Sequence, residues 1–143
     1  MNQQLERKLE NLRKSIRKLD SAIVTYTDSI DDAFLLRICR DELGEKAIAV
    51  TICPDDYLET ELSITESVTK VLGIKHIVTK KSQLKKLATR MNIQNILVGI
   101  SKGNPASLII GVKCPLLECG LTKAEIEFLA KELGVDKLKK KKY

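Results

Sequence analysis

The sequence predicts an α/β protein, a three-layer sandwich built on a five-stranded parallel sheet. Short runs rich in Val, Ile, Ala and Thr alternate with segments whose apolar residues recur at helical spacing. Three of these helical segments end in Leu-Gly or Met-Asn, and a β-rich run follows two residues later. The length of 143 residues suits one domain with its own core. Strands alternating with helices favour βα units and right-handed crossovers on a parallel sheet.

The N-terminal segment is predicted to form an amphipathic helix over about residues 2–18. Its apolar stripe has spacings of four, three, four and three and consists of Leu5, Leu9, Leu12, Ile16 and Leu19. We favour a helix docked on the rest of the domain. The alternative is a coiled-coil helix that makes a homo-oligomer, although the repeat is short. The basic residues between these positions are expected to form a solvated face. They are Arg7, Lys8, Arg13, Lys14, Arg17 and Lys18.

The first half of the domain is expected to contain two strands, each followed by a helix. Strand one is expected over Ala22–Tyr26, and its helix runs from about Ile30 to Leu43. Gly44 suits the left-handed conformation that closes a helix. Strand two, Ala47–Ile52, is broken by a proline, and a second helix is expected over Glu59–Leu72.

Strand three is expected over His76–Thr79, and Ser82 is expected to cap a helix over Gln83–Met91. Asn92 then takes the place of a terminating glycine. Strand four is expected over Asn95–Ile100.

The C-terminal part is expected to add strand five and a last helix. Strand five is placed at Lys113–Leu117. Thr122 and Glu125 have the spacing of a capping box for a helix over Lys123–Leu133. We therefore expect one domain over residues 1–136 and a basic tail over 137–143.

The segment between strand one and its helix is the predicted functional loop. In a parallel α/β sheet this joint opens on the carboxyl edge of the strands, where ligands bind. The candidate cofactor-binding residues are Thr27, Asp28, Ser29, Asp31 and Asp32, together with Thr51 near the end of strand two.

Two stretches carry a resemblance to a known family. Ile23–Leu36 resembles the phosphate-loop region of the PP-loop ATP pyrophosphatases, whose motif is Ser-Gly-Gly-x-Asp-Ser. Pro115–Ile126 reads Pro-Leu-Leu-Glu-Cys-Gly-Leu-Thr-Lys-Ala-Glu-Ile. It is similar to a Pro-Leu-Leu-Glu-x-Gly-Leu-Thr-Lys-x-Glu-Ile segment of the sacrificial sulfur transferases of lactate-racemase cofactor synthesis. The resemblance spans roughly residues 5–136.

This resemblance implies an adenine nucleotide alpha hydrolase-like fold with strand order 3-2-1-4-5. It also implies a loop that holds the phosphates of ATP, with Mg, while a substrate is adenylated. Thr27 stands at the motif's first serine, and Asp28 and Ser29 stand at its glycines. Asp31 matches its aspartate, and Asp32 replaces its last serine. The family's C-terminal half, which bears the sulfur-donating cysteine, has no counterpart in this sequence, so we expect a truncated relative.

The loop departs from the motif in ways that weaken phosphate binding. Glycines give such a loop its special dihedrals and its close approach to phosphate. A carboxylate about 4 Å from a phosphate charge costs about 1 kcal/mol in water and about 4 kcal/mol at an effective dielectric of 20. Asp28 and Asp32 add two such charges. Ser29 and Asp32 also have capping-box spacing, which favours an ordinary helix start. A cation site made from Asp28, Asp31 and Asp32 is the remaining alternative.

Composition and the spacing of Cys and His bear on the class of protein, its compartment and metal binding. The chain is 43% hydrophobic and 31% charged, which predicts a globular protein, and no apolar run is long enough to cross a membrane. Cytoplasm is the expected compartment. Four cysteines without paired spacing and a single histidine, His76, argue against a zinc site. The histidine is expected in the core or at a strand edge.

The function predicted from the sequence is a degenerate PP-loop domain with weak or no ATP binding. It would serve as a non-catalytic binding or regulatory module with an unidentified protein partner, and no cofactor is expected. The alternative is an active adenylating or sulfur-transfer enzyme that uses ATP and Mg through an altered loop. A second alternative is weak nucleic-acid binding through the basic ends, which the net charge of +6 permits.

Overall fold

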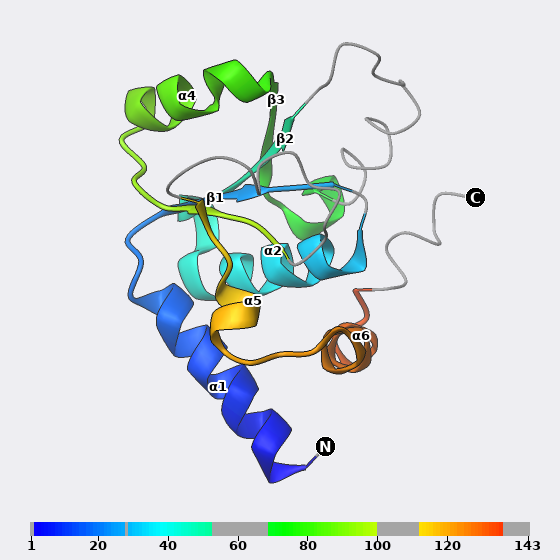
Figure 1. The fold of residues 1–143 in the computed structure, drawn as a ribbon. Helices are drawn as coiled ribbons and strands as arrows, with labels where there is room; N and C mark the ends of the chain where they lie inside the picture. The colour runs from blue at the N-terminus through cyan, green and yellow to red at the C-terminus, as the bar shows by residue number, and fades with distance from the viewer. Residues whose placement is uncertain (1, 28, 53–68, 100–111, 136–143) are drawn as a thin grey trace, which may run out of the picture.

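The computed structural model describes residues 2–27, 29–52, 69–99 and 112–135 (Figure 1). Within them, five parallel strands form one sheet in the order β3-β2-β1-β4-β5. The strands are β1 (Ala22–Thr25), β2 (Ala47–Ile52), β3 (Lys75–Thr79), β4 (Ile96–Leu97) and β5 (Val112–Lys113). The predicted class, sheet and strand order are confirmed.

Helices cover the sheet unequally on its two faces. In Figure 1 the sheet lies between α4 and α2, and α1, α5 and α6 lie beyond α2. The helices are α1 (Gln3–Arg17), α2 (Ile30–Leu43), α4 (Leu84–Arg90), α5 (Pro115–Glu118) and α6 (Lys123–Glu132). Two short 3₁₀ turns, η1 (Gly44–Lys46) and η2 (Lys81–Gln83), precede β2 and α4. None of the described helices has the length and hydropathy that crossing a bilayer requires.

The alternation of side chains along the strands divides the interior into two cores. Val24, Ala49 and Leu97 pack with α1, α2, α5 and α6. Ile23 and Val50 point to the other face and pack beneath α4 with Leu84 and Ala88. α2 is buried along most of its surface because the sheet lies on one side of it and α1 and α6 lie on the other. A helix in that position is apolar nearly all round.

α1 docks on its own chain. Leu5, Leu12 and Ile16 are buried in the core with α2, and Leu9 and Leu19 pack against the same cluster. The basic face of α1 that was predicted to be solvated is only partly exposed to solvent, because some of its residues form ion pairs with other helices. Arg13 and Arg17 bind Glu42 of α2 at 3.1 and 2.8 Å, and Lys8 binds Glu125 of α6 at 2.9 Å. The stripe that a second copy would need is therefore covered by this chain.

Several local predictions are confirmed. Gly44 and Asn92 have φ of 60° and 57°, as expected for helix termination. The Thr122–Glu125 capping box forms with both hydrogen bonds present. His76 lies on the edge strand β3.

Three local predictions are wrong. Residues Pro115–Leu117 belong to α5 and not to strand five, because proline fits the first turn of a helix, where its missing N–H costs nothing. Ser82 lies inside η2, and α4 begins after Gln83 with no side-chain cap. Strand four is shorter than predicted, with pairing at Ile96 and Leu97. Cys53, most of the second helix, the segment 101–111 and the basic tail lie outside the described residues.

Candidate functional site

The predicted loop lies where the connections from the sheet diverge. β1 is flanked by β2 on one side and β4 on the other, so the crevice at its carboxyl end is the switch point of the sheet. Thr27 follows β1, and Ser29 caps α2. The first turn of α2 places Asp31 and Asp32 against this crevice, with exposures of 1% and 0%. Asp28 lies outside the described residues.

The Asp32 carboxylate is bound by donors from two segments. Its Oδ2 accepts hydrogen bonds from the backbone N–H of Thr27 at 3.0 Å and from the Thr27 hydroxyl at 2.7 Å. Its Oδ1 accepts the backbone N–H of Gly99 at 3.0 Å. Burial raises the pKa of Asp32 from 3.8 to about 6, helped by the nearby charge of Asp31 and opposed by these hydrogen bonds. The carboxylate is therefore mainly ionised at neutral pH.

Ser29 forms one half of the predicted capping box. Its Oγ accepts the backbone N–H of Asp32 at 3.4 Å. The second bond of the box is not made, because the Asp32 carboxylate accepts the N–H of Thr27 and not that of Ser29. The N–H of Ser29 donates to Thr27 Oγ1 at 3.3 Å. The loop is thus closed by a small network of Thr27, Ser29 and Asp32.

Asp31 is buried beside this network with little compensation. Neither of its oxygens has a hydrogen-bond partner among the described residues. Its Oδ1 lies 3.8 Å from the Lys123 ammonium, which projects from α6 and is 62% exposed. A buried carboxylate without hydrogen bonds is costly. The burial of Asp31 is therefore poorly compensated, because one long ion pair replaces the hydrogen bonds that its carboxylate lacks.

Thr51 is not part of this network. It lies at the carboxyl end of β2, where its hydroxyl donates to the Tyr26 carbonyl at 3.0 Å and lies 2.7 Å from His76 Nε2. Its polar group thus links three adjacent strands and does not contact the carboxylates of the loop. Of the predicted site residues that the structure describes, it brings together Thr27, Ser29, Asp31 and Asp32 and leaves Thr51 apart.

Three residues that the sequence did not assign to the site also lie around the carboxylates of Asp31 and Asp32. They are Gly99, Cys114 and Lys123. A Cβ atom at Gly99 would lie 2.4 Å from Asp32 Oδ1 and 3.0 Å from Asp31 Oδ2, so a residue without a side chain is required there. The Cys114 thiol lies 3.5 Å from the Gly99 carbonyl. For Gly99 and Cys114 the implied strand order was the available signal, because it places the end of β4 beside the end of β1 and the end of β5 beside that of β4.

Cys114 is a poor nucleophile in this position. Burial is the main cause that raises the pKa of its thiol, and the negative charges of Glu118, Asp31 and Asp32 raise it further. A reactive cysteine needs the opposite surroundings, which stabilise the thiolate. Among the described residues, no three His, Cys, Asp or Glu side chains are arranged to hold a metal ion.

Two backbone N–H donors beside this helix start, those of Thr27 and Gly99, are occupied from within the chain. Backbone N–H groups at a loop and the beginning of a helix ordinarily make a site for an anion. Here two backbone N–H groups and one hydroxyl bind the Asp32 carboxylate. The chain thus supplies its own anion at the switch point of the sheet.

Comparison with solved structures identifies two proteins with this fold. The NH3-dependent NAD synthetase of Campylobacter jejuni superposes with a TM-score of 0.65 and 17% identity over 99% of this chain and 78% of that chain. The NMN synthetase of Francisella tularensis has a TM-score of 0.61 and 13% identity over 94% and 73% of the two chains. These likenesses establish the fold of this chain as adenine nucleotide alpha hydrolase-like.

Sequence comparison adds one relative. An uncharacterized protein of Synechocystis sp., slr1717, is 24% identical over 163 residues, which cover 92% of this chain and 61% of the relative. This chain therefore spans about three fifths of the length of that protein. No protein-family model matches the sequence.

Proposed function

We propose that this protein is a PP-loop-like domain that binds ATP weakly or not at all and serves as a non-catalytic binding or regulatory module. The observation that carries the proposal is the Asp32 carboxylate, which accepts hydrogen bonds from Thr27 and Gly99. A phosphate would need such donors, and it would meet a negative charge already bound to them. The sulfur-transferase-like assignment rests on the resemblance of Pro115–Ile126 and is part of the same proposal.

Electrostatics supports the loss of affinity. One carboxylate about 4 Å from a phosphate charge costs about 4 kcal/mol at an effective dielectric of 20. That is about a thousandfold in affinity, because about 1.4 kcal/mol corresponds to tenfold. Asp32, which the family motif lacks, is fully buried at the loop, so solvent screens its charge poorly. Asp31, which matches the motif's aspartate, is buried beside it. The Lys123 ammonium offsets only part of this charge from its distance of 3.8 Å.

ATP and Mg are the cofactors that the fold implies, and the described residues do not fit them. The N–H donors of Thr27 and Gly99 are used by Asp32, a buried carboxylate at the position where the family motif has a serine. A lone carboxylate such as Asp31 is a ligand type that Mg accepts, but an octahedral site takes further oxygen ligands. We therefore derive no reaction step through ATP.

Isothermal titration calorimetry with ATP, with and without Mg, tests this proposal. We expect no binding tighter than the millimolar range at neutral pH. Micromolar affinity would overturn the proposal. A parallel assay for pyrophosphate release from ATP addresses the alternative of an active adenylating enzyme, and ATP-dependent release above the buffer rate would establish that alternative.

A further inference from the structure

Basic residues are concentrated in one continuous part of the chain. Residues 67–117 contain nine Lys and Arg and no Asp or Glu. The rest of the chain has 16 Lys and Arg against 19 Asp and Glu, a net charge of −3. Residues 67–117 therefore carry a charge of +9, more than the +3 of residues 1–20 and the +4 of residues 136–143.

Six of these residues form what we call the α4 face. They lie on β3, η2, α4 and the residue between β3 and η2. All six are exposed, and none forms an ion pair with a described residue. The six are Lys75, Lys80, Lys81, Lys85, Lys86 and Arg90.

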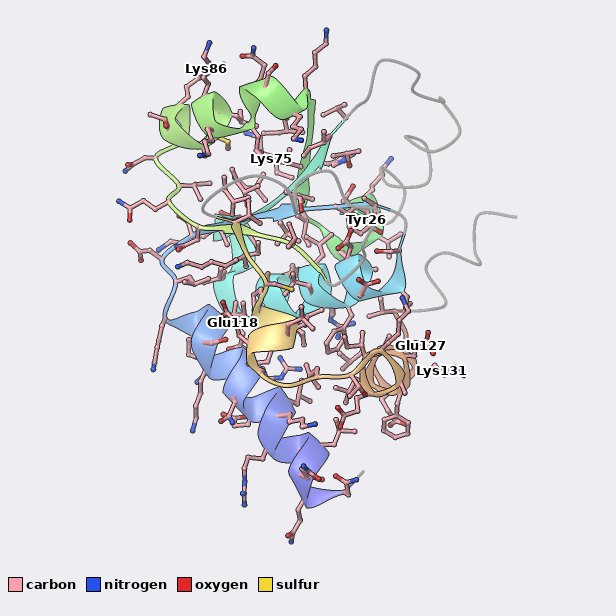
Figure 2. All side chains as sticks on the ribbon, in the orientation of Figure 1. Tyr26, Lys75, Lys86, Glu118, Glu127 and Lys131 are labelled. Atoms are coloured by element: carbon pink, nitrogen blue, oxygen red, sulfur yellow. The ribbon has the colours of Figure 1, made fainter. Side chains whose placement is uncertain are left out.

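The sheet and α2 separate this face from α5 and α6, which together have more Glu than Lys. Figure 2 shows Lys86 on α4 and Lys75 near β3, whereas Glu118 and Glu127 lie at α5 and α6 beyond α2. Lys75 is two positions before Ile77 on β3, so their side chains are on the same face of the sheet. Ile77 packs in the core beneath α4, and Lys75 is therefore on the same side of the sheet as α4. Salt largely screens the interaction of exposed charges that are farther apart than a Debye length, about 8–10 Å at physiological salt. Counted over the residues that the structure describes, the α4 face therefore carries an excess of positive charge.

Polar groups that suit phosphate and sugar oxygens lie beside these charges. A hollow of about 480 Å³ at the end of α4 is lined by Lys85, Thr89, Asn92 and Gln94, among others. A second hollow brings Lys85 and Thr89 together with Lys86 and Arg90. Side chains of these types make most of the contacts to the backbone of nucleic acids.

The composition of this part of the chain argues against three other anionic partners, namely an acidic protein, a single-stranded nucleic acid and a membrane surface. Residues 67–117 contain no Phe, Tyr or Trp. Protein interfaces are enriched in aromatic residues and depleted in Lys, and single-stranded nucleic acids stack on aromatic rings. A membrane-surface helix inserts an apolar face, but Leu84 and Ala88 of α4 are buried in the domain core.

We propose that the α4 face binds the phosphate backbone of double-stranded nucleic acid without reading its sequence. This site is independent of the phosphate loop, and it differs from the basic ends to which the sequence pointed. Each phosphate that a Lys or Arg neutralises adds about 0.9 to the slope of log affinity against log salt on B-form DNA. The slope of log affinity against log salt therefore reports how many phosphates the α4 face contacts.

The test replaces three exposed lysines of η2 and α4 by glutamine, as Lys81→Gln, Lys85→Gln and Lys86→Gln together. Glutamine has nearly the same helix propensity, so the fold should be retained, and circular dichroism checks this. Fluorescence anisotropy measures binding to labelled duplex DNA and duplex RNA of about 20 base pairs between about 50 and 200 mM salt. We expect the triple variant to lower the slope on DNA by about 2 to 3 and to weaken binding at least about tenfold at the lowest salt. The two duplexes show which helical form is preferred.

A matched control changes the same amount of charge on α1, on the far side of the sheet, as Arg7→Gln, Lys14→Gln and Lys18→Gln together. These residues are exposed and pair with no described residue. The control should leave the slope within about 0.5 of the unaltered protein. Equal losses in the two triple variants would overturn the proposal, as would the absence of binding by the unaltered protein at about 50 mM salt.

Three further arms separate the alternatives. A chain lacking residues 139–143 should retain most of the salt slope, and loss of most of it would assign binding to the tail. Polyglutamate and vesicles with anionic lipid should compete poorly with duplex. Tighter binding to either would overturn the nucleic-acid assignment in favour of an acidic protein or a membrane surface.

Discussion

The Oδ1 atom of Asp32 accepts a hydrogen bond from the backbone N–H of Gly99 at 3.0 Å, although the two residues are 67 positions apart in the sequence. This bond joins the start of α2 to the segment that follows β4. It is possible because β4 is the neighbour of β1 in the sheet. The same contact uses a donor that a bound anion would otherwise take, so it links the stability of the loop to its proposed loss of ATP binding.

Replacing Gly99 by alanine should destabilise the protein by about 1–3 kcal/mol, the usual cost of forcing extra volume into a packed site. The new Cβ would lie 2.4 Å from Asp32 Oδ1 and 3.2 Å from the Asp32 backbone nitrogen, so the loop must move. Urea unfolding measures the change. Gly134→Ala is the comparison, because open space surrounds Gly134 and only its φ of 74° disfavours a side chain. A Gly99→Ala variant as stable as the unaltered protein would contradict the described packing.

Asp32→Asn should become more stable relative to the unaltered protein as the pH rises. Burial raises the pKa of Asp32 from 3.8 to about 6. Below about pH 3 the group is protonated in both the folded and the unfolded chain, and no penalty arises. Between about pH 4 and 6 the unfolded chain ionises first, so folding loses stability, and the loss is complete above about pH 6. Its size is about 3 kcal/mol, at about 1.4 kcal/mol for each tenfold change.

Urea unfolding of both proteins at several pH values between about 4 and 7 measures this difference. Asp20→Asn, at an exposed position, is the control. A difference between the Asp32→Asn variant and the unaltered protein that stays constant with pH would contradict the raised pKa.

Restoring the family's loop should restore affinity for ATP. The variant combines Asp28→Gly, Ser29→Gly and Asp32→Ser, which returns both glycines and removes two carboxylates. Removing the Asp32 charge frees the N–H donors of Thr27 and Gly99, so we expect affinity to rise at least about tenfold. Calorimetry measures the affinity, with Asp20→Ser as the control. A restored variant that folds and still ignores ATP would show that the site is wrongly assigned.

Leu12→Ala should cost about 2–5 kcal/mol of stability, because Leu12 is fully buried between α1 and the core. Leu9→Ala should cost less, since Leu9 is only partly buried. Unfolding experiments measure both changes, and light scattering follows the mass in solution. A fall in mass for Leu12→Ala without loss of stability would show that the stripe pairs two copies of the chain.

The sequence by itself determined the features that depend on near neighbours. Helix termination at Gly44 and Asn92 follows from backbone dihedrals, and the Thr122–Glu125 cap needs only two residues three apart. The alternation of strands and helices follows from the periodicity of apolar residues. The run at Pro115 was misassigned because a short apolar run is compatible with either a strand or a helix.

Only the tertiary structure decided which partner each polar group finds. Asp32 had the spacing to bind Ser29, yet its carboxylate binds Thr27 and Gly99, because β4 ends beside it. Lys123 approaches Asp31 from a helix more than 90 positions away, and Lys86 of α4 lies across the sheet from Glu118 of α5 and Glu127 of α6. Such contacts depend on the order of the strands in the sheet and on how the chain passes from one layer of the fold to the next. A local pattern carries no information about them, since hydrogen bonds and ion pairs act through space and not along the sequence.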